Sequence, residues 1–178
     1  MKYVFILVLL LAASAPAVNK GTEWTGVETD FSNRFISHME IESIHCQSCI
    51  LRNVQAEFAK FKYGFCKSCN FSDLRGTGLQ MRSINIENGI FQRANLRSSD
   101  LSAVRAYQSD FSEANLSMAS LWSADLRYSK FIKTDLRGAN LENALLKGSD
   151  LHGALFDAHT RLPFSKEEAL RRGMQWQP

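Results

Sequence analysis

The 178-residue chain carries little net charge and none of the short motifs that mark common enzyme classes. Its formal net charge is +3, with 22% charged residues, which argues for neither a nucleic-acid-binding surface nor an acidic tail. It has no GxSxG, no HExxH and no phosphate-binding glycine loop. Its four histidines are scattered, at His38, His45, His152 and His159. We therefore expect no catalytic residues, no enzymatic activity and no nucleic-acid partner.

The apolar run at the N-terminus is too short to cross a membrane. Residues 4–13 form a run of about ten apolar residues after Lys2, whereas a transmembrane helix needs about 20. Ala15-Pro16-Ala17 then supplies the small-x-small pattern of a cleavage site. The sequence predicts a signal peptide over residues 1–17, a mature chain from Val18 without a membrane span, and export to a periplasm or secretion. An uncleaved N-terminal anchor is the alternative.

A five-residue repeat dominates residues 94–156. Of its thirteen central positions, twelve are Leu or Phe and one is Ala106. The residue two before each centre is small in every repeat except at Val104, and the residue between is Asp or Asn in eight of the thirteen. The centres are Leu96, Leu101, Ala106, Phe111, Leu116, Leu121, Leu126, Phe131, Leu136, Leu141, Leu146, Leu151 and Phe156.

A period of five fits neither a helix nor a straight strand. On an α-helix each step would turn the centres by about 140° around the axis, and on a strand an odd step alternates the face. Positions two apart share a face of an extended segment, so the small residue and the centre can point inward together. If the chain turns a corner before each next pair, it forms a square coil with an apolar interior. Asp and Asn suit those corners because they hydrogen-bond nearby backbone.

This A(D/N)Lxx pattern resembles the signature of the pentapeptide-repeat family. The resemblance covers residues 46–156 and is strongest over 91–156. It implies an all-β solenoid, a right-handed quadrilateral β-helix with four pentapeptides per coil. Some family members mimic DNA and bind DNA gyrase, which needs a strongly acidic surface. Between residues 93 and 150, eight Lys and Arg offset seven Asp and Glu, so we do not expect DNA mimicry here.

The flanking segments and one coil depart from the pattern. Residues 18–45 read as an N-terminal leader or cap. In the coil over 72–90, Leu74, Leu79 and Ile84 occupy the small positions, and Gly76 occupies a centre. This predicts an irregular coil without a net insertion, in which Gly76 and Gly78 supply positive φ for a bulge. The register within this coil is left open.

Residues 157–178 read as a C-terminal cap. Ser165 and Glu168 match a capping box, and Gly173 is a stop signal, so we expect a short helix near 166–172. A solenoid needs its open end covered, both to shield apolar residues and to block strand addition. The residues expected to form that lid are Phe164, Leu170, Met174 and Trp176.

The four cysteines form two CxxC pairs with sixteen residues between them: Cys46 and Cys49, then Cys66 and Cys69. This spacing suits a four-cysteine zinc site, whereas export favours disulfides. The coil length implied by the resemblance stacks one pair above the other. Structural disulfides, one structural zinc, a redox-active pair and free thiols all remain open, and connectivity is not determined. No other cofactor is expected.

Outward positions of the repeat form a candidate interaction surface. Stacking places Tyr107, Arg127 and Lys147 in one column, with Arg105 and Tyr128 beside it and Trp122 on the adjoining face. Exposed aromatics beside arginine are typical of contact sites. We therefore expect a structural or protein-interaction module with an unidentified protein partner, and a homodimer remains open. The alternative is an exported thiol-redox or zinc-binding protein that uses the CxxC pairs.

Overall fold

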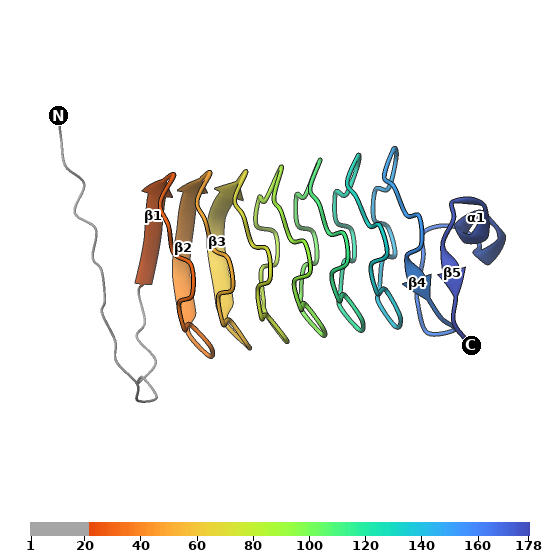
Figure 1. Cartoon of the computed structure of the whole chain (residues 1–178), viewed down its shortest axis with the longest axis horizontal. Coiled ribbons are helices and arrows are strands. Elements are labelled where there is room, and N and C mark those ends of the chain that lie inside the picture. Colours follow the sequence, from red (N-terminus) through yellow and green to blue (C-terminus); the bar gives the residue numbers. More distant parts are fainter. Residues whose placement is uncertain (1–21) are drawn as a thin grey trace.

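Every fifth residue from Asp30 to Asp135 pairs with the residue 20 positions further on. Such parallel pairs run from Asp30 with Ile50 to Asp135 with Leu155, so each coil has four sides of five residues. The computed structural model describes residues 22–178 as a parallel β-solenoid of about eight turns with almost no helix (Figure 1). The expected square solenoid is confirmed.

Regular strands lie at the two ends of the solenoid. At the N-terminal end, β1 (Thr22–Val27), β2 (Glu40–Gln47) and β3 (Lys60–Lys67) form one parallel sheet in the order β1-β2-β3. At the C-terminal end, β4 (Leu155–Phe156) pairs in parallel with β5 (Gln175–Trp176). Between them the coils are connected by single bridges at each side.

A left-handed residue closes each regular corner. The residue two after the centre has a positive φ at twenty non-glycine positions, with values from 53° to 63°. The N–H that follows then bonds back to the carbonyl of the centre, as in Ala94 to Phe91 at 3.0 Å. Because this turn repeats every five residues, the chain bends in the same sense at every corner.

The repeated Asp and Asn cap these corners, as the sequence analysis expected. The Oδ1 atom of Asp110 accepts the backbone N–H of Ser112 at 2.9 Å, and that of Asn115 accepts the N–H of Ser117 at 3.0 Å. A short side chain with an acceptor at this distance mimics a backbone turn. The same bond forms at Asp30, Asn70, Asn85, Asn95, Asp100, Asp125, Asp135, Asn140, Asp150 and Asp157.

The interior is filled by the centres and the small residues. Twelve of the thirteen centres between 96 and 156 are at most 2% exposed and Leu146 is 5% exposed. In one column, aromatic rings stack from coil to coil nearly in parallel, with centroids 4.5 to 5.1 Å apart. This stack consists of Phe71, Phe91, Phe111 and Phe131.

The predicted irregularity over 72–90 is wrong, because the bridges continue without a shift through residues 75, 80, 85 and 90. Leu74 and Leu79 fill small positions and are buried, and Gly76 at the centre between them leaves the room. A Cβ on Gly76 would lie 2.9 Å from Leu74 Cδ2 and 3.1 Å from Leu79 Cδ2. Large and small residues have exchanged places, so the interior volume is kept without a bulge. Gly78 has a φ of +68° at an ordinary corner position.

The solenoid also begins earlier than residue 46. β1 pairs with β2 from Thr22 to Val27, so much of the segment 18–45 assigned to a leader already lies in coils. Extended strands replace the corners after Ile41 and Phe61, which explains why the small-residue signal is weak there. The predicted signal peptide over 1–17 lies outside the described residues.

The C-terminal cap forms as expected, with one exception. α1 (Lys166–Arg171) begins after Ser165, whose Oγ accepts the N–H of Glu168 at 3.3 Å. Met174 is 3% exposed, and the Trp176 ring meets Phe156 edge to face at 5.2 Å. Leu170, expected in the lid, is 47% exposed. Its neighbour Ala169 is buried against the core instead, because so short a helix presents only one narrow face to the coils.

Candidate functional site

Aromatic and basic side chains meet on one outer face of the solenoid. The rings of Tyr107 and Tyr128, from successive coils, lie edge to face with centroids 5.5 Å apart. The Arg127 guanidinium carbon lies 5.8 Å from the centroid of the Tyr107 ring, within reach of a cation–π contact. The coil length predicts that these three residues lie together, and they do lie in contact.

Tyr128 occupies a left-handed corner with a φ of 59° and is 48% exposed. Its ring lies against Gly148 of the next coil, where a Cβ would stand 2.6 Å from a ring carbon. Glycine at this position therefore lets the ring lie flat along the surface. The aromatic side chain is held in place while its outer side stays open to a partner.

Asp125 fixes the orientation of Arg127. Both carboxylate oxygens accept from the guanidinium, at 2.8 Å from Nε and 2.7 Å from Nη2. This pairing holds the pKa of Asp125 below its usual value, and it raises the pKa of Arg127. Arg105 adds to the positive field at Asp125. The face thus carries a preorganised arginine between two tyrosines.

Leu145 was not predicted and extends this face toward the C-terminal cap. It is 51% exposed and lines a groove of about 590 Å³ together with Arg127 and Lys147. The far wall of the groove includes Phe164 and Arg172, whose guanidinium carbon lies 4.5 Å from the Phe164 ring centroid. We call Arg105, Tyr107, Arg127, Tyr128, Leu145 and Lys147 the aromatic–basic face.

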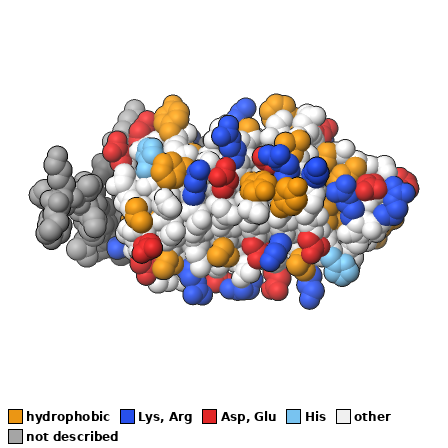
Figure 2. Space-filling view, turned by 90° about the horizontal axis from the view of Figure 1, so that it is seen from above, with side chains coloured by type: hydrophobic (Ala, Val, Ile, Leu, Met, Phe, Trp, Pro, Cys, Tyr) orange, Lys and Arg blue, Asp and Glu red, His pale blue; other side chains and the backbone are white. Residues whose placement is uncertain are grey.

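A signal for Leu145 was present in the sequence. It stands where the repeat places Asp or Asn, and a leucine cannot make the corner hydrogen bond that those residues make. The groove itself was not predictable, because Phe164 and Arg172 lie beyond the repeat. Trp122 is 41% exposed and comes from the preceding side of its coil, at the margin of the aromatic–basic face. In Figure 2, hydrophobic and basic side chains intermingle on the visible surface.

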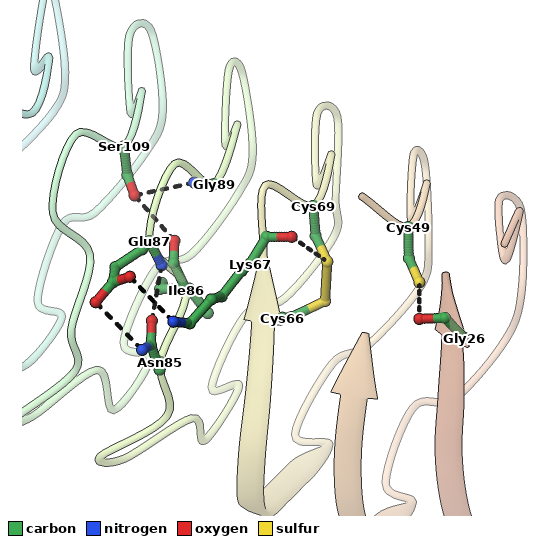
Figure 3. Close-up of a disulfide and its surroundings, with 10 residues drawn as sticks. All are labelled: Gly26, Cys49, Cys66, Lys67, Cys69, Asn85, Ile86, Glu87, Gly89 and Ser109. Carbon is green, nitrogen blue, oxygen red and sulfur yellow. Dashed lines mark hydrogen bonds and ion pairs between the residues drawn. A yellow bond between two sulfur atoms is a disulfide. The ribbon is translucent and has the colours of Figure 1, made fainter. Parts of the chain in front are cut away.

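The two CxxC pairs lie at the same corner of successive coils. Cys46 is the register partner of Cys66 in the β2–β3 pairing, which confirms the expected stacking. A disulfide joins Cys66 to Cys69 within one coil, with Cα atoms 5.6 Å apart. Cys46 and Cys49 are unbridged in the structure, and all four cysteines are fully buried. Figure 3 shows the disulfide on one coil and Cys49 on the coil before it.

Burial governs the chemistry of the free thiols. Removal from water, together with the neighbouring Cys49, raises the pKa of Cys46, so its nucleophilic thiolate form is scarce. Cys49 Sγ lies 3.5 Å from the carbonyl oxygen of Gly26, to which it donates. Within residues 22–178, no group of three or more His, Cys, Asp or Glu is placed to hold a metal ion. No helix in that range has the length and apolarity to span a membrane.

Comparison with known proteins identifies the repeat. The family model for pentapeptide repeats matches residues 80–117, 90–127 and 124–157, with eight copies. No curated protein matches the chain.

Several solved structures of pentapeptide repeat proteins match the chain at low sequence identity. HetL of the cyanobacterium Nostoc sp. strain PCC 7120, a pentapeptide repeat protein involved in heterocyst differentiation regulation, is 17% identical with a TM-score of 0.41. That match covers 76% of this chain, which spans 65% of the length of HetL. A second Nostoc pentapeptide repeat protein is 25% identical over 61% of this chain and 84% of its own, with a TM-score of 0.33. One from the Arabidopsis thaliana thylakoid lumen is 19% identical over 84% and 73%, with a TM-score of 0.30.

One five-residue period accounts for the corner hydrogen bonds and for the buried central residues. It is also the period of the eight matched repeats. Residues 80–157 of the chain are pentapeptide repeats.

Proposed function

We propose that the protein is an exported, non-enzymatic interaction module that binds a protein partner on the aromatic–basic face. The observation that carries this proposal is the half-exposed pair Tyr128 and Leu145, set beside Arg127 at the edge of a groove. Tyrosine and arginine are over-represented among residues that dominate binding energy. A groove next to them can accept an anchoring side chain.

The charges of the face indicate the chemistry of the partner. Arg127, Lys147 and Arg172 line the groove. The nearby acids Asp125 and Glu168 are already bound to arginines. An acidic segment with an aromatic or aliphatic side chain complements this surface, because its carboxylates meet basic groups and its apolar side chain enters the groove. We therefore propose a partner that presents such a segment.

A structural or binding role agrees with how the chain uses its polar residues. Pentapeptide-repeat proteins are generally structural modules without enzymatic activity. The repeated Asp and Asn accept backbone N–H groups at the corners, so their proximity to one another needs no catalytic explanation. The interior is packed with apolar side chains.

Export is supported by the N-terminal sequence and by the cysteines. Residues 1–17 have the charged start, apolar run and small-x-small end of a signal peptide. The bridge between Cys66 and Cys69 suits an oxidising compartment. The intact mass of the protein recovered from the exported fraction tests this, and a chain that starts at Val18 is the expected result. A retained N-terminus would overturn it.

The alternative function, thiol-redox chemistry or zinc binding by the CxxC pairs, has less support. A redox catalyst needs an accessible thiolate of low pKa, whereas the cysteines here are buried and the pKa of Cys46 is raised. A four-thiolate zinc site would require the Cys66–Cys69 bridge to be reduced. Metal analysis of the purified protein under air decides this, since one bound zinc per chain would favour the alternative.

The interaction is tested with substitutions that introduce residue types already found at equivalent positions of other coils. Tyr128→Asn introduces the residue found at the equivalent corner of Asn88, and Leu145→Asn introduces a normal corner acceptor. Both variants should fold. Met118→Ser is the matched control, because Met118 is an exposed left-handed residue on another side of the solenoid, and Ser98 stands one coil before it.

The measurement proceeds in two steps. Crosslinking in the exported fraction, followed by mass spectrometry, identifies the partner, and calorimetry with the purified partner gives Kd. Each variant at 128 or 145 should weaken binding by about tenfold or more, the loss typical of a residue that dominates an interface. The Met118→Ser variant should bind like the unmodified protein. If the substitutions at 128 and 145 leave Kd unchanged, the partner does not use this face.

A further inference from the structure

The corner that holds Cys46 and Cys49 repeats the corner that holds the disulfide. Both read Cys-x-Ser-Cys, and the two are in register one coil apart, with Cys46 beside Cys66 and Gln47 beside Lys67. The serines have nearly the same left-handed φ, 55° at Ser48 and 54° at Ser68. The backbone therefore offers the first pair the same geometry as the second.

The side chains of the first pair also meet. The thiols of Cys46 and Cys49 are close enough to interact electrostatically, and both residues are fully buried. In the equivalent pair one coil on, Cα atoms at 5.6 Å carry a bridge, which is inside the range that disulfides span. The Cys66 sulfur already has a partner within its own coil, so it is not free to bond to Cys46 above or below it.

We infer that Cys46 and Cys49 close a second disulfide, so that two successive coils of the solenoid each carry their own bridge across the same corner. The two bridges stack in register, one per coil, and none joins one coil to the next. This differs from the coil-to-coil pairing that simple stacking of residues 20 apart would suggest. The inference does not depend on the aromatic–basic face or on any partner.

The reaction requires an external disulfide, such as oxidised glutathione or a disulfide-donor protein. A thiolate at position 46 or 49 attacks one sulfur of the donor, and the other donor sulfur leaves as a thiolate. The second cysteine, deprotonated, then attacks the protein sulfur of this mixed disulfide. The Cys46–Cys49 bond forms, a second donor thiol is released, and two electrons and two protons pass from the protein to the donor.

The timing of this reaction follows from burial. In the folded coil the thiols have no access to solvent, and burial raises the pKa of Cys46, so attack on a donor is slow. In the unfolded chain both cysteines are exposed, with ordinary pKa values. The bridge therefore forms while the chain folds, and the folded coil then protects it from reductant.

Closing the bridge costs little elsewhere in the corner. It removes the thiol proton that Cys49 donates to the carbonyl of Gly26, and a thiol is a weak donor. Two serines in the same column make the corresponding bond, from Ser109 to Ile86 and from Ser129 to Ala106, at 3.0 and 2.7 Å. The chain therefore tolerates either a hydroxyl or a sulfur at this position.

Peptide mapping tests the connectivity directly, because trypsin cleaves between the two cysteine pairs and also between Cys66 and Cys69. The mature chain is refolded in glutathione buffer, its free thiols are alkylated in denaturant, and it is digested without reduction. We expect peptide 35–52 to be unlinked, unalkylated and two hydrogens lighter than its reduced mass. Peptides 63–67 and 68–75 should be joined by the bridge between residues 66 and 69. Alkylation of Cys46 and Cys49 would overturn the inference, as would linkage of peptide 35–52 to another peptide.

A matched variant provides an independent measurement. Cys46→Ala with Cys49→Ser recreates the corner that the chain forms three coils later at Ala106 and Ser109, so it should fold. In the unmodified protein, refolding with reductant should lower Tm relative to refolding in glutathione buffer. The double variant should show a smaller reductant-dependent shift, which reflects the bridge at 66 and 69 alone. Equal shifts in the two proteins would mean that positions 46 and 49 carry no bridge.

Discussion

Gly64 lies against the backbone of Ile44 one coil earlier, so closely that a Cβ at position 64 would stand 1.9 Å from the Ile44 carbonyl oxygen. Its φ is +112°, a conformation that side chains other than hydrogen rarely adopt. This contact lies inside the β2–β3 pairing, where extended strands replace the usual corner. The glycine therefore allows the first coils to approach one another.

We predict that Gly64→Ala lowers the free energy of unfolding by more than about 3 kcal/mol, since backbone strain and overpacking add at this position. Gly138→Ala is the control. Its φ is also positive, at +67°, but its Cβ would come no closer than 3.5 Å to Met118, so it should cost about 1 kcal/mol. Urea unfolding followed by circular dichroism measures both. Equal losses in the two variants would contradict the role of the Ile44 contact.

A second prediction concerns the exchange of large and small residues at 74–79. Gly76→Ala should destabilise the protein, because the new Cβ would lie 2.9 Å from Leu74 Cδ2. In a protein that already carries Leu74→Ala, the same glycine substitution should cost less by about 0.5 kcal/mol or more, since neighbouring residues couple. The double-mutant cycle is measured by urea unfolding. Additive effects would show that the two positions do not share volume.

The sequence predicted those parts of the fold in which each pentapeptide has the usual order of a small residue, Asp or Asn, and a Leu or Phe centre. Phe111 and Leu116 are buried because a coil with a five-residue period places every central residue in the interior. Asp110 lies at a corner because the turn requires a hydrogen-bond acceptor. At Leu74 and Gly76 a large side chain in a small position is compensated by a glycine in the neighbouring central position. The total interior volume is preserved, but comparing each position separately with the repeat pattern does not reveal this. The start of the coils was missed because β1 and β2 are strands without the small-residue signal.

The candidate site was predictable in part for the same reason. A 20-residue coil places Tyr107, Arg127 and Lys147 in one column, and Tyr128 is next to it. The groove depends on Phe164 and Arg172, whose positions follow from how the cap folds back on the last coil. The cysteine pairing was also left open, because stacking sets which coils are adjacent but not which way each sulfur turns.

A third prediction is a loss of stability in acid. Hydrogen bonds from Arg127 and Arg137 lower the pKa of Asp125 and Asp135 below the usual value of 3.8. A carboxyl whose pKa is lower in the folded state stabilises the fold above its unfolded pKa, and this contribution disappears as the pH falls through the folded pKa. The free energy of unfolding should therefore decrease as the pH falls from about 5 to about 2.

Asn at these positions separates charge from turn geometry. The variant with Asp125→Asn and Asp135→Asn keeps the corner acceptor that Asn115 provides elsewhere but cannot titrate. Its stability should fall less over the same acid range than that of the unmodified protein. Tm measured at several pH values checks this. Parallel curves for the two proteins would show that these carboxylates do not contribute to the acid sensitivity.

The fourth prediction concerns the aromatic stack in the interior. Phe111 lies between Phe91 and Phe131, with ring centroids 4.9 and 5.1 Å away, and it is fully buried. Phe111→Ala should lower the free energy of unfolding by about 3–5 kcal/mol, because it leaves a cavity between two rings that the coils cannot close. Phe111→Leu should cost only about 1 kcal/mol, since volume is largely kept and the column already contains leucine at Leu51 and Leu151. Urea unfolding of both variants measures the difference. If the leucine variant were as unstable as the alanine variant, ring stacking rather than filled volume would hold this column together.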